Sequence, residues 1–291
     1  MKPPPFRYHD PATVAEAIEL LARLDNALLL AGGQSLMPML NFRVAAPDHL
    51  IDLGRIAPLA HIRIENDAGR FGAMTRQRDL EFSPEVAARF PIVREALAHV
   101  GHRQTRNRGT FGGSLCHLDP SAELVNMVAL HDGVLVAAGP SGERRIAIAD
   151  WVAGMMTNAL APGELLTGIE MAAWPAGHGY AFEEFARRRG DFAIAAVGCL
   201  VTTGPDGAIA RAALCVSGLS PAPLRLGAAE RLLTGQAPSP ALFRAAAEQA
   251  GAIEVTDDAF VSGHYRAHLA RVLTVRALAR ATSGIGNRRA A

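Results

Sequence analysis

The spacing of apolar residues in the first half of the chain alternates between helical and strand-like periods. Asp10-Pro11 is a typical helix start, and apolar residues then recur at helical intervals through Leu24. Ser83-Pro84 has the same signature before a longer apolar helix that Gly101 can end, whereas residues 102–109 are basic and predict a loop. The predicted helices are 11–24, 83–100 and 122–130. Short apolar runs predict strands at 27–31, 50–53, 62–64, 71–74, 134–137, 145–148 and 165–171.

The second half has a different order of elements, with strands first and helices last. Around residues 173–179 the composition shifts to proline and glycine, which is typical of a linker. Strands are predicted at 180–186, 192–203 and 209–217, with a hairpin turn at 204–207, and helices at 228–233, 241–250 and 264–281. We therefore predict an α+β fold with two domains, residues 1–177 and 178–285. The chain should fray from Ser283 and end in a flexible tail at 286–291.

The composition, 49% hydrophobic and 20% charged, is that of an ordinary globular protein. The 29 Lys and Arg residues balance 28 Asp and Glu residues to a net charge of +1, so no strong field favours nucleic acid or an anionic membrane. The 2 Trp, 3 Tyr and 11 Phe residues are few for a surface that stacks nucleic-acid bases. The N-terminus lacks the apolar stretch of a signal peptide, and the longest apolar run is about half of the ~20 residues that a membrane helix needs. We expect a cytoplasmic protein that neither binds nucleic acid nor inserts into a membrane.

Three cysteines, Cys116, Cys199 and Cys215, show no CxxC spacing. An odd number of cysteines without a leader predicts reduced thiols, and three thiolates fall short of the four that an iron–sulfur cluster needs. Because their surroundings are apolar, we predict that all three are core residues. His117 and Asp119 suggest a pair of metal ligands, but no third ligand follows at a diagnostic spacing, so no metal site is predicted.

Two glycine-rich segments are the sharpest chemical feature of the sequence. Ala31-Gly32-Gly33-Gln34-Ser35-Leu36 follows a predicted strand, and Thr110-Phe111-Gly112-Gly113-Ser114 follows the basic loop. Glycines let the backbone approach a ligand closely, and successive N–H groups in such turns can form a nest, a concave row of donors that binds an anion. Two nests could hold a pyrophosphate, with the hydroxyls of Ser35, Thr110 and Ser114 as further donors. The alternative is that each glycine pair only marks a tight turn. Neither segment matches GxGxxG or GxxxxGK[ST], so the Rossmann and P-loop fingerprints are missing.

Further segments accompany the glycine pairs: Arg106-Asn107-Arg108-Gly109, Asp119-Pro120-Ser121-Ala122-Glu123, Gly163-Glu164-Leu165-Leu166 and Arg188-Arg189-Gly190-Asp191-Phe192-Ala193. Together these segments resemble the FAD-binding medium subunit of molybdenum hydroxylases of the carbon monoxide dehydrogenase and xanthine dehydrogenase type. The similarity extends from Tyr8-His9 to the last predicted helix. The order and spacing of the segments argue against coincidence.

The resemblance implies a two-lobed FAD-binding domain of the vanillyl-alcohol oxidase/p-cresol methylhydroxylase type, covered at the flavin by the smaller C-terminal α+β domain. Both glycine segments would wrap the FAD pyrophosphate. Glu123, where the family more often has Asp, would bind hydroxyls of the ribitol or the adenosine, and Leu166 would lie near the isoalloxazine through backbone and apolar contact. The implied site contains no catalytic and no metal-binding residue. Its cofactor-binding residues are Ala31, Gly32, Gly33, Gln34, Ser35, Leu36, Thr110, Phe111, Gly112, Gly113, Ser114, Glu123, Leu166 and Phe192.

Departures from the family pattern occur near the start of the second domain. Family members often carry Lys just before the double-arginine segment, where this chain has Glu183-Glu184, so a lysine contact to the flavin is in doubt. Phe192 stands where some relatives have Tyr. It either stacks on the flavin as part of a lid or is the first core residue of the strand predicted at 192–203. Arg187-Arg188-Arg189 is either a solvated basic face or a charge clamp near the flavin or a partner subunit.

The function that the resemblance implies is electron transfer. Substrate would be hydroxylated at a molybdenum cofactor in a large subunit, and electrons would pass through two 2Fe–2S clusters of a small subunit to FAD in this chain. An external acceptor would then take them. The expected assembly is a heterotrimer, with dimerisation of the complex left open. One alternative is a stand-alone FAD oxidase or reductase, which would need an acid or base beside the flavin. Another is a scaffold without flavin, which the intact glycine segments disfavour. The sequence identifies neither the substrate nor the acceptor among NAD, quinone and oxygen.

Overall fold

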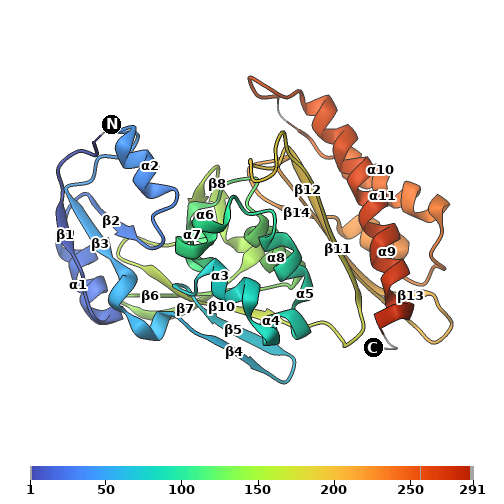
Figure 1. The fold of residues 1–291 in the computed structure, drawn as a ribbon, viewed down its shortest axis with the longest axis horizontal. Helices are drawn as coiled ribbons and strands as arrows, with labels where there is room; N and C mark the ends of the chain where they lie inside the picture. The colour runs from blue at the N-terminus through green and yellow to red at the C-terminus, as the bar shows by residue number, and fades with distance from the viewer. Residues whose placement is uncertain (1, 256, 289–291) are drawn as a thin grey trace.

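The computed structural model describes residues 2–255 and 257–288, and its three larger sheets lie one after another along the longest axis (Figure 1). The N-terminal lobe holds a parallel sheet with the order β1-β3-β2, formed by β1 (Arg7–His9), β2 (Ala27–Leu30) and β3 (His49–Asp52). Helix α1 (Val14–Arg23) packs against this sheet through apolar residues at helical spacing, centred on the buried Ala17. Helix α2 (Leu36–Asn41) follows β2 after a short turn.

The central lobe is an antiparallel sheet of five strands with helices packed on it. The strands in spatial order are β4 (Ile62–Glu65), β5 (Ala68–Gly72), β10 (Leu165–Ala172), β6 (Val134–Gly139) and β7 (Gly142–Ala147). Strands β8 (Val152–Gly154) and β9 (Thr157–Asn158) form a separate small hairpin. The helices are α3 (Gln77–Phe82), α4 (Pro84–Arg89), α5 (Pro91–Leu97), α6 (Arg103–Arg108), α7 (Phe111–His117) and α8 (Glu123–Leu130); short 3-10 turns span Leu53–Arg55, Ala57–Leu59 and Ile148–Asp150.

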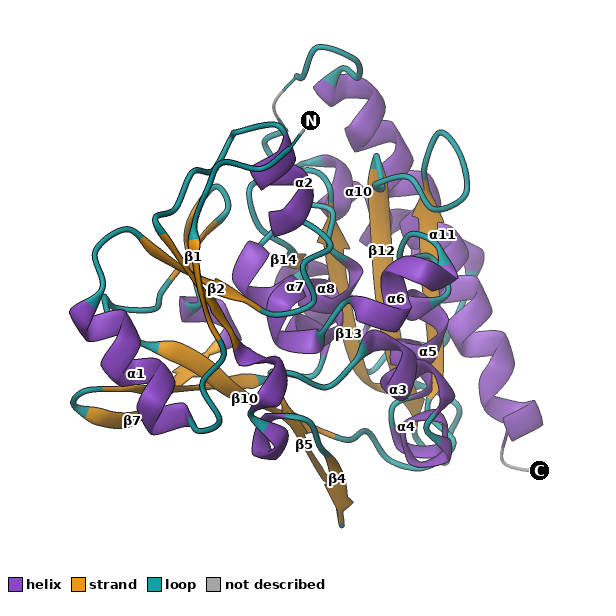
Figure 2. Cartoon of the chain, turned by 60° about the vertical axis from the view of Figure 1, so that its left-hand side comes forward, coloured by secondary structure: helices purple, strands orange, loops and turns teal. Residues whose placement is uncertain are grey.

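The C-terminal unit has the strands-then-helices order that the sequence predicts. Its antiparallel sheet consists of β11 (Gly179–Phe185), β12 (Ala195–Thr203), β13 (Ile209–Ser217) and β14 (Leu224–Arg225), in that order. Helices α9 (Gly227–Leu233) and α11 (Gly263–Arg288) cover one face of the sheet (Figure 1). Helix α10 (Pro240–Gly251) packs on these two helices, and Figure 2 shows it with α11 next to the strands. The apolar side chains of this face form a core of their own.

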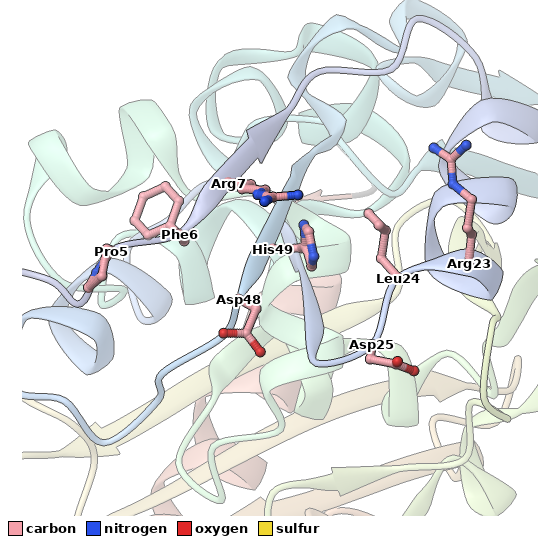
Figure 3. A pocket seen from close by; sticks show the side chains of 8 residues that line it. All are labelled: Pro5, Phe6, Arg7, Arg23, Leu24, Asp25, Asp48 and His49. Atoms are coloured by element: carbon pink, nitrogen blue, oxygen red, sulfur yellow. The ribbon is translucent and has the colours of Figure 1, made fainter.

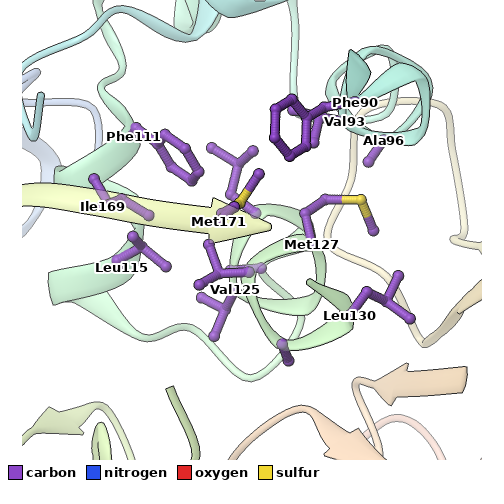
Figure 4. Close-up of a cluster of buried hydrophobic side chains, with 14 of the residues drawn as sticks. Phe90, Val93, Ala96, Phe111, Leu115, Val125, Met127, Leu130, Ile169 and Met171 are labelled. Atoms are coloured by element: carbon purple, nitrogen blue, oxygen red, sulfur yellow. The ribbon is translucent and has the colours of Figure 1, made fainter. Parts of the chain in front are cut away.

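Helix α8 fills the space between the central sheet and the C-terminal sheet. All its residues are buried, which explains why only Glu123 and Asn126 among them are polar. Its side chains join those of α5, α7 and β10 in the largest core, which Figure 4 shows in part, and this core continues into the C-terminal sheet through Phe182, Leu200 and Cys215. Asn126 Nδ2 also donates hydrogen bonds across the boundary to Cys215 O (3.1 Å) and Ser217 Oγ (3.2 Å). The central lobe and the C-terminal unit are therefore packed against each other continuously.

The boundaries of two predicted helices were wrong. Helix α1 begins at Val14 because the hydroxyl of Thr13 accepts the N–H of Glu16 (3.2 Å), whereas Asp10 pairs with Arg55 (2.8 Å). The long helix predicted at 83–100 is two helices, α4 and α5. Pro91 interrupts the helical hydrogen bonds since it has no N–H to donate.

Three further predictions were wrong near the domain boundary and the C-terminus. Residues 102–109 are largely helical (α6), because Arg106 forms a bidentate ion pair with Glu81 (2.7 and 3.0 Å) that holds this polar segment in place. Strand β12 begins at Ala195 rather than at residue 192. Helix α11 continues through Arg288, so residues 283–288 are helical, and the rest of the expected tail lies outside the described residues. Within residues 2–255 and 257–288, no helix has the length and hydropathy of a membrane span.

Candidate cofactor site

The first glycine segment is an open turn between β2 and α2. Gly33 has a φ of 72°, a left-handed conformation that glycine adopts without strain, and its carbonyl accepts the N–H of Met37 (3.0 Å). None of the described residues accepts a hydrogen bond from the amides of Gly32, Gly33, Gln34 or Ser35. This turn therefore presents a row of free N–H donors at the carboxyl end of β2, as a nest requires.

The second glycine segment is not a second nest, contrary to the expectation. It is the first turn of α7, capped by Thr110, and its amides already have partners. The N–H of Phe111 donates to Thr75 O (2.9 Å), that of Gly112 to Ala73 O (2.8 Å) and that of Gly113 to Thr110 Oγ1 (3.0 Å). A Cβ on Gly112 would lie 2.6 Å from the Cβ of Ala73, so this glycine serves close packing onto the central sheet. What the segment can offer a ligand is the hydroxyl groups of Thr110 and Ser114.

The two glycine segments nevertheless lie side by side. A Cβ added to Gly32 would stand 2.3 Å from Arg108 O and 2.8 Å from Gly109 Cα, and one added to Gly113 would stand 3.5 Å from the Cβ of Ala31. The first turn thus fits against the second segment only because Gly32 has no side chain. The structure brings together at one place the residues that sequence analysis paired.

Two arginines beside this junction were not predicted as site residues. Arg76 Nη1 donates to Arg108 O (2.5 Å), and burial, followed by the neighbouring positive charge of Arg108, lowers the pKa of Arg76. An anion placed against the free amides would relieve the repulsion between these two guanidinium groups. The sequence around Arg76 carries no signal for this role, since the residue reaches Arg108 only through the fold.

Two buried carboxyl groups lie where the central lobe meets the C-terminal unit. Glu123 is the first residue of α8 and only 9% exposed, and burial, followed by the negative charge of Glu184, raises its pKa to about 8. Glu184 on β11 has a buried Oε2 without a hydrogen-bond partner among the described residues. Buried polar atoms of this kind usually find a partner, so Oε2 of Glu184 remains available to a hydrogen-bond donor.

The remaining predicted site residues have different surroundings. The rings of Phe111 and Phe71 pack edge to face in the core, with centroids 5.6 Å apart, so the Phe111 side chain faces away from any ligand. The side chain of Leu166 is also in the core, which leaves only its backbone for contact with a cofactor. Phe192 is 70% exposed and precedes β12, so its interpretation as a core residue was wrong. It lies beside Gly190, where an added Cβ would come within 2.9 Å of Gly101 O in the central lobe.

Arg187 and Arg188 of the arginine run have partners within the chain, and the three cysteines are buried or partly buried. Arg187 lies over the ring of Phe260 (5.0 Å to the centroid), and Arg188 pairs with Asp191 (3.1 Å). Burial raises the pKa values of Cys116, Cys199 and Cys215, and Cys199 and Cys215 are core residues, as predicted. In the part of the chain that the structure describes, no cluster of three or more His, Cys, Asp or Glu residues could hold a metal ion.

A hollow of about 620 Å³ on the N-terminal lobe is separate from the glycine segments (Figure 3). Arg7, Asp48 and His49 line it near the starts of β1 and β3. It therefore lies at the amino ends of the parallel strands, whereas the free amides follow the carboxyl end of β2. Ligands of parallel sheets bind outside the carboxyl ends, so the glycine turn is the better candidate.

Comparisons with known proteins identify the family of this chain. Residues 4–174 match a family model described as the FAD binding domain in molybdopterin dehydrogenase, and residues 180–281 match the CO dehydrogenase flavoprotein C-terminal domain. The fold and these matches define a flavoprotein and confirm the predicted fold class. The chain belongs to the FAD-binding medium subunits of the carbon monoxide dehydrogenase and xanthine dehydrogenase family.

Individual relatives cover nearly the whole chain. The 6-hydroxypseudooxynicotine dehydrogenase complex subunit alpha of Paenarthrobacter nicotinovorans is 38% identical, over 97% of this chain and 96% of the relative. The carbon monoxide dehydrogenase medium chain of Afipia carboxidovorans is 36% identical, over 99% and 100%. Among solved structures, a carbon monoxide dehydrogenase from Hydrogenophaga pseudoflava superposes with a TM-score of 0.94 at 37% identity, covering 97% of this chain and 99% of the matched chain.

Proposed function

We propose that this chain holds FAD at the junction of its two glycine segments and passes electrons from the 2Fe–2S clusters of a partner subunit through the flavin to an external acceptor. The observation that supports the proposal most directly is the row of free amides from Gly32 to Ser35, packed against the second segment and next to Arg76 and Arg108. A pyrophosphate carries the charge that these donors require, and its size suits two adjoining segments.

The other parts of the cofactor would be held by residues on both sides of the domain boundary. The hydroxyls of Thr110 and Ser114 would add to the pyrophosphate contacts, and Glu123 would bind a hydroxyl of the ribitol or the adenosine. Phe192 would stack on the isoalloxazine, since it is exposed next to the contact between Gly190 and the central lobe. The flavin would then lie between residues 1–177 and residues 178–285. The FAD supplies the redox chemistry, and the chain supplies binding and orientation.

The proposed partners are a large subunit with the molybdenum cofactor and a small subunit with the 2Fe–2S clusters, in a cytoplasmic heterotrimer. The relatives support an assembly, because they are called a complex subunit alpha and a medium chain. The cysteines support the division of labour, since Cys199 and Cys215 are buried in separate cores and burial disfavours the thiolates that cluster ligation needs.

Titration of the purified chain with FAD tests the binding proposal. Wild type should bind one FAD per chain and gain several kcal/mol of stability when FAD exceeds its dissociation constant by about 100–1,000-fold. Gly32→Val should lose FAD binding, because its side chain would push the first turn away from Arg108. Gly227→Ala is the matched control, since an added Cβ there meets nothing closer than 3.4 Å. Absence of flavin absorbance and of stabilisation in wild type would refute the proposal.

The electron-transfer role is tested by substrate-free and substrate-containing reactions. The isolated, FAD-loaded chain should not be reduced by an organic substrate, and the chain should co-purify with a molybdenum subunit and a cysteine-rich subunit when all are expressed together. Substrate-dependent reduction of the flavin in the isolated chain would instead favour a stand-alone FAD oxidase or reductase.

A further inference from the structure

The loop between β11 and β12, residues 186–194, is closed at its base and rests on the central lobe at its tip. At the base, the N–H of Ile194 donates to Phe185 O (2.8 Å). At the tip, Gly190 has a φ of 85°, and a Cβ added to it would lie 2.9 Å from Gly101 O. The loop therefore approaches the central lobe closely because its tip is a glycine. It spans the boundary at which the flavin is proposed to lie.

The two arms of this loop are anchored differently. The arm that leaves β11 is largely exposed, and its Arg187 lies over the ring of Phe260 (5.0 Å to the centroid). The arm that enters β12 ends in Ala193 and Ile194, which are 4% and 8% exposed and belong to two different hydrophobic cores. Phe192 directly precedes this buried pair. The position of its exposed ring therefore depends on how firmly the pair is held.

Arg266 on α11 holds the arm that enters β12. Its Nη1 donates to Ile194 O (2.7 Å) and to Gly218 O (2.6 Å), and its Nη2 donates to a carboxylate oxygen of Asp258. The side chain of Arg266 is only 13% exposed, so these charge-assisted hydrogen bonds are shielded from water. The planar guanidinium group directs its N–H groups in fixed directions, which sets the geometry as well as the strength of the contact.

A second contact to the same arm comes from the segment that leads into α8. Ser121 Oγ donates to Ala193 O (2.8 Å). The N–H of Gly218 donates to Pro120 O (2.9 Å), so the segment before α8 is also joined to the residue whose carbonyl Arg266 binds. The arm that carries the exposed ring is therefore held from the central lobe and from α11 at once.

We propose that residues 186–193 are a lid over the flavin and that Arg266 is its positioning residue, an inference that rests on the proposed function. Arg266 acts through Ile194, because the bond to this carbonyl fixes the backbone from which Phe192 projects. A lid must open to admit a cofactor and close to exclude water from it. Opening would break the close packing at Gly190 and keep the hydrogen bonds of Arg266, so the exposed ring returns to the same position each time the lid closes.

Trypsin cleavage after the exposed arginines of residues 187–189, followed by mass spectrometry, measures opening of the lid in the full chain. Bound FAD should slow this cleavage in wild type. Arg266→Gln should be cleaved there about tenfold faster or more, with and without FAD, because the loss of charge-assisted hydrogen bonds raises the population of the open lid. Arg271→Gln is the matched control, since Arg271 on the same helix pairs with Glu248 of α10 (3.2 Å). Cleavage at Arg23 in α1 reports general unfolding and should stay unchanged.

The flavin of the FAD-loaded chain provides a readout that a merely structural role of Arg266 would leave unchanged. The visible spectrum and the midpoint potential should shift in Arg266→Gln and stay the same in Arg271→Gln. Arg266→Lys should be intermediate in cleavage and in potential, because lysine keeps the charge but lacks the planar fork. Gly190→Ala tests the tip, since its Cβ would push the loop away from Gly101 O. This variant should be cleaved faster than wild type although every bond of Arg266 is kept.

The lid and the role of Arg266 can fail separately. Equal cleavage of wild type with and without bound FAD, or wild-type cleavage in Gly190→Ala, would overturn the lid. Wild-type cleavage and potential in Arg266→Gln, or cleavage that rises equally at Arg23, would overturn the positioning role, and Arg266→Lys decides this point if Arg266→Gln does not fold. All these outcomes leave the proposed function intact. Failure of wild type to bind FAD would instead refute the proposed function.

Discussion

Glu123 should make the stability of the FAD-free protein depend on pH in a direction opposite to that of most carboxyl groups. Its pKa is raised from 4.5 to about 8 by burial and by Glu184. Between these pH values the folded state binds more protons than the unfolded state, so the free energy of unfolding falls as the pH rises and levels off above the folded-state pKa. The full loss is on the order of 5 kcal/mol, since each pKa unit corresponds to about 1.36 kcal/mol.

Glu123→Gln removes this dependence because the amide is neutral at every pH. Urea unfolding of both proteins at about pH 6 and about pH 9 should show the variant gaining roughly 3 kcal/mol on wild type between the two conditions. Other shifted groups, such as Glu183 and Glu164, are present in both proteins and cancel in the comparison. A difference between variant and wild type that is the same at both pH values would refute the conclusion that Glu123 is held neutral.

Three further predictions concern the site and its boundary. Phe192→Ala should change the free energy of unfolding by less than about 0.5 kcal/mol, because the side chain is 70% exposed, but it should alter the flavin spectrum or lower FAD affinity. Urea unfolding and FAD titration measure both, and a large loss of stability would contradict the exposed position. Arg76→Gln should weaken FAD binding by about tenfold or more through loss of a charge-assisted contact, and calorimetry would show an unchanged affinity if the anion lies elsewhere. Asn126→Ala should lower the free energy of unfolding by about 1–3 kcal/mol, because two buried hydrogen bonds are lost. Urea unfolding measures this loss, and a free energy of unfolding equal to that of wild type would argue against a direct contact between the central lobe and the C-terminal unit.

Sequence patterns predicted most of the strands because each is a short apolar run with a definite end. The strand at 27–31 and the hairpin of β12 and β13 are examples, and the paired glycine segments indicated that residues far apart in sequence would meet. The strands could be recognised without coordinates because their patterns are local, and the pairing of the glycine segments because it belongs to the family resemblance.

Other features depend on contacts that no local pattern carries. The helix at Arg103–Arg108 is polar on all sides, and its position is fixed by the ion pair with Glu81. The amides of the second glycine segment were expected to be free, but Ala73 and Thr75 accept two of them once β5 and α7 come together. Arg76 is beside the first segment only because it pairs with Thr110 in an isolated antiparallel bridge. Each of these three features depends on a partner that is distant in the sequence and that only the folded structure identifies.

The ion pair between Arg280 and Glu95 has a consequence for the order in which the molecule can be completed during synthesis. Arg280 belongs to α11, the last helix, and it also donates to Phe182 O (2.9 Å) on β11, whereas Glu95 belongs to α5 in the central lobe. A nascent chain can therefore form these contacts only after Arg280 has been translated, 98 residues after Phe182. The largest core is shared by the central lobe and the C-terminal sheet, so it too remains incomplete until β12 and β13 have been translated. A chain that ends before α11 would lack both contacts, and Glu95 and the carbonyl of Phe182 would lose the guanidinium group that joins α5 to β11.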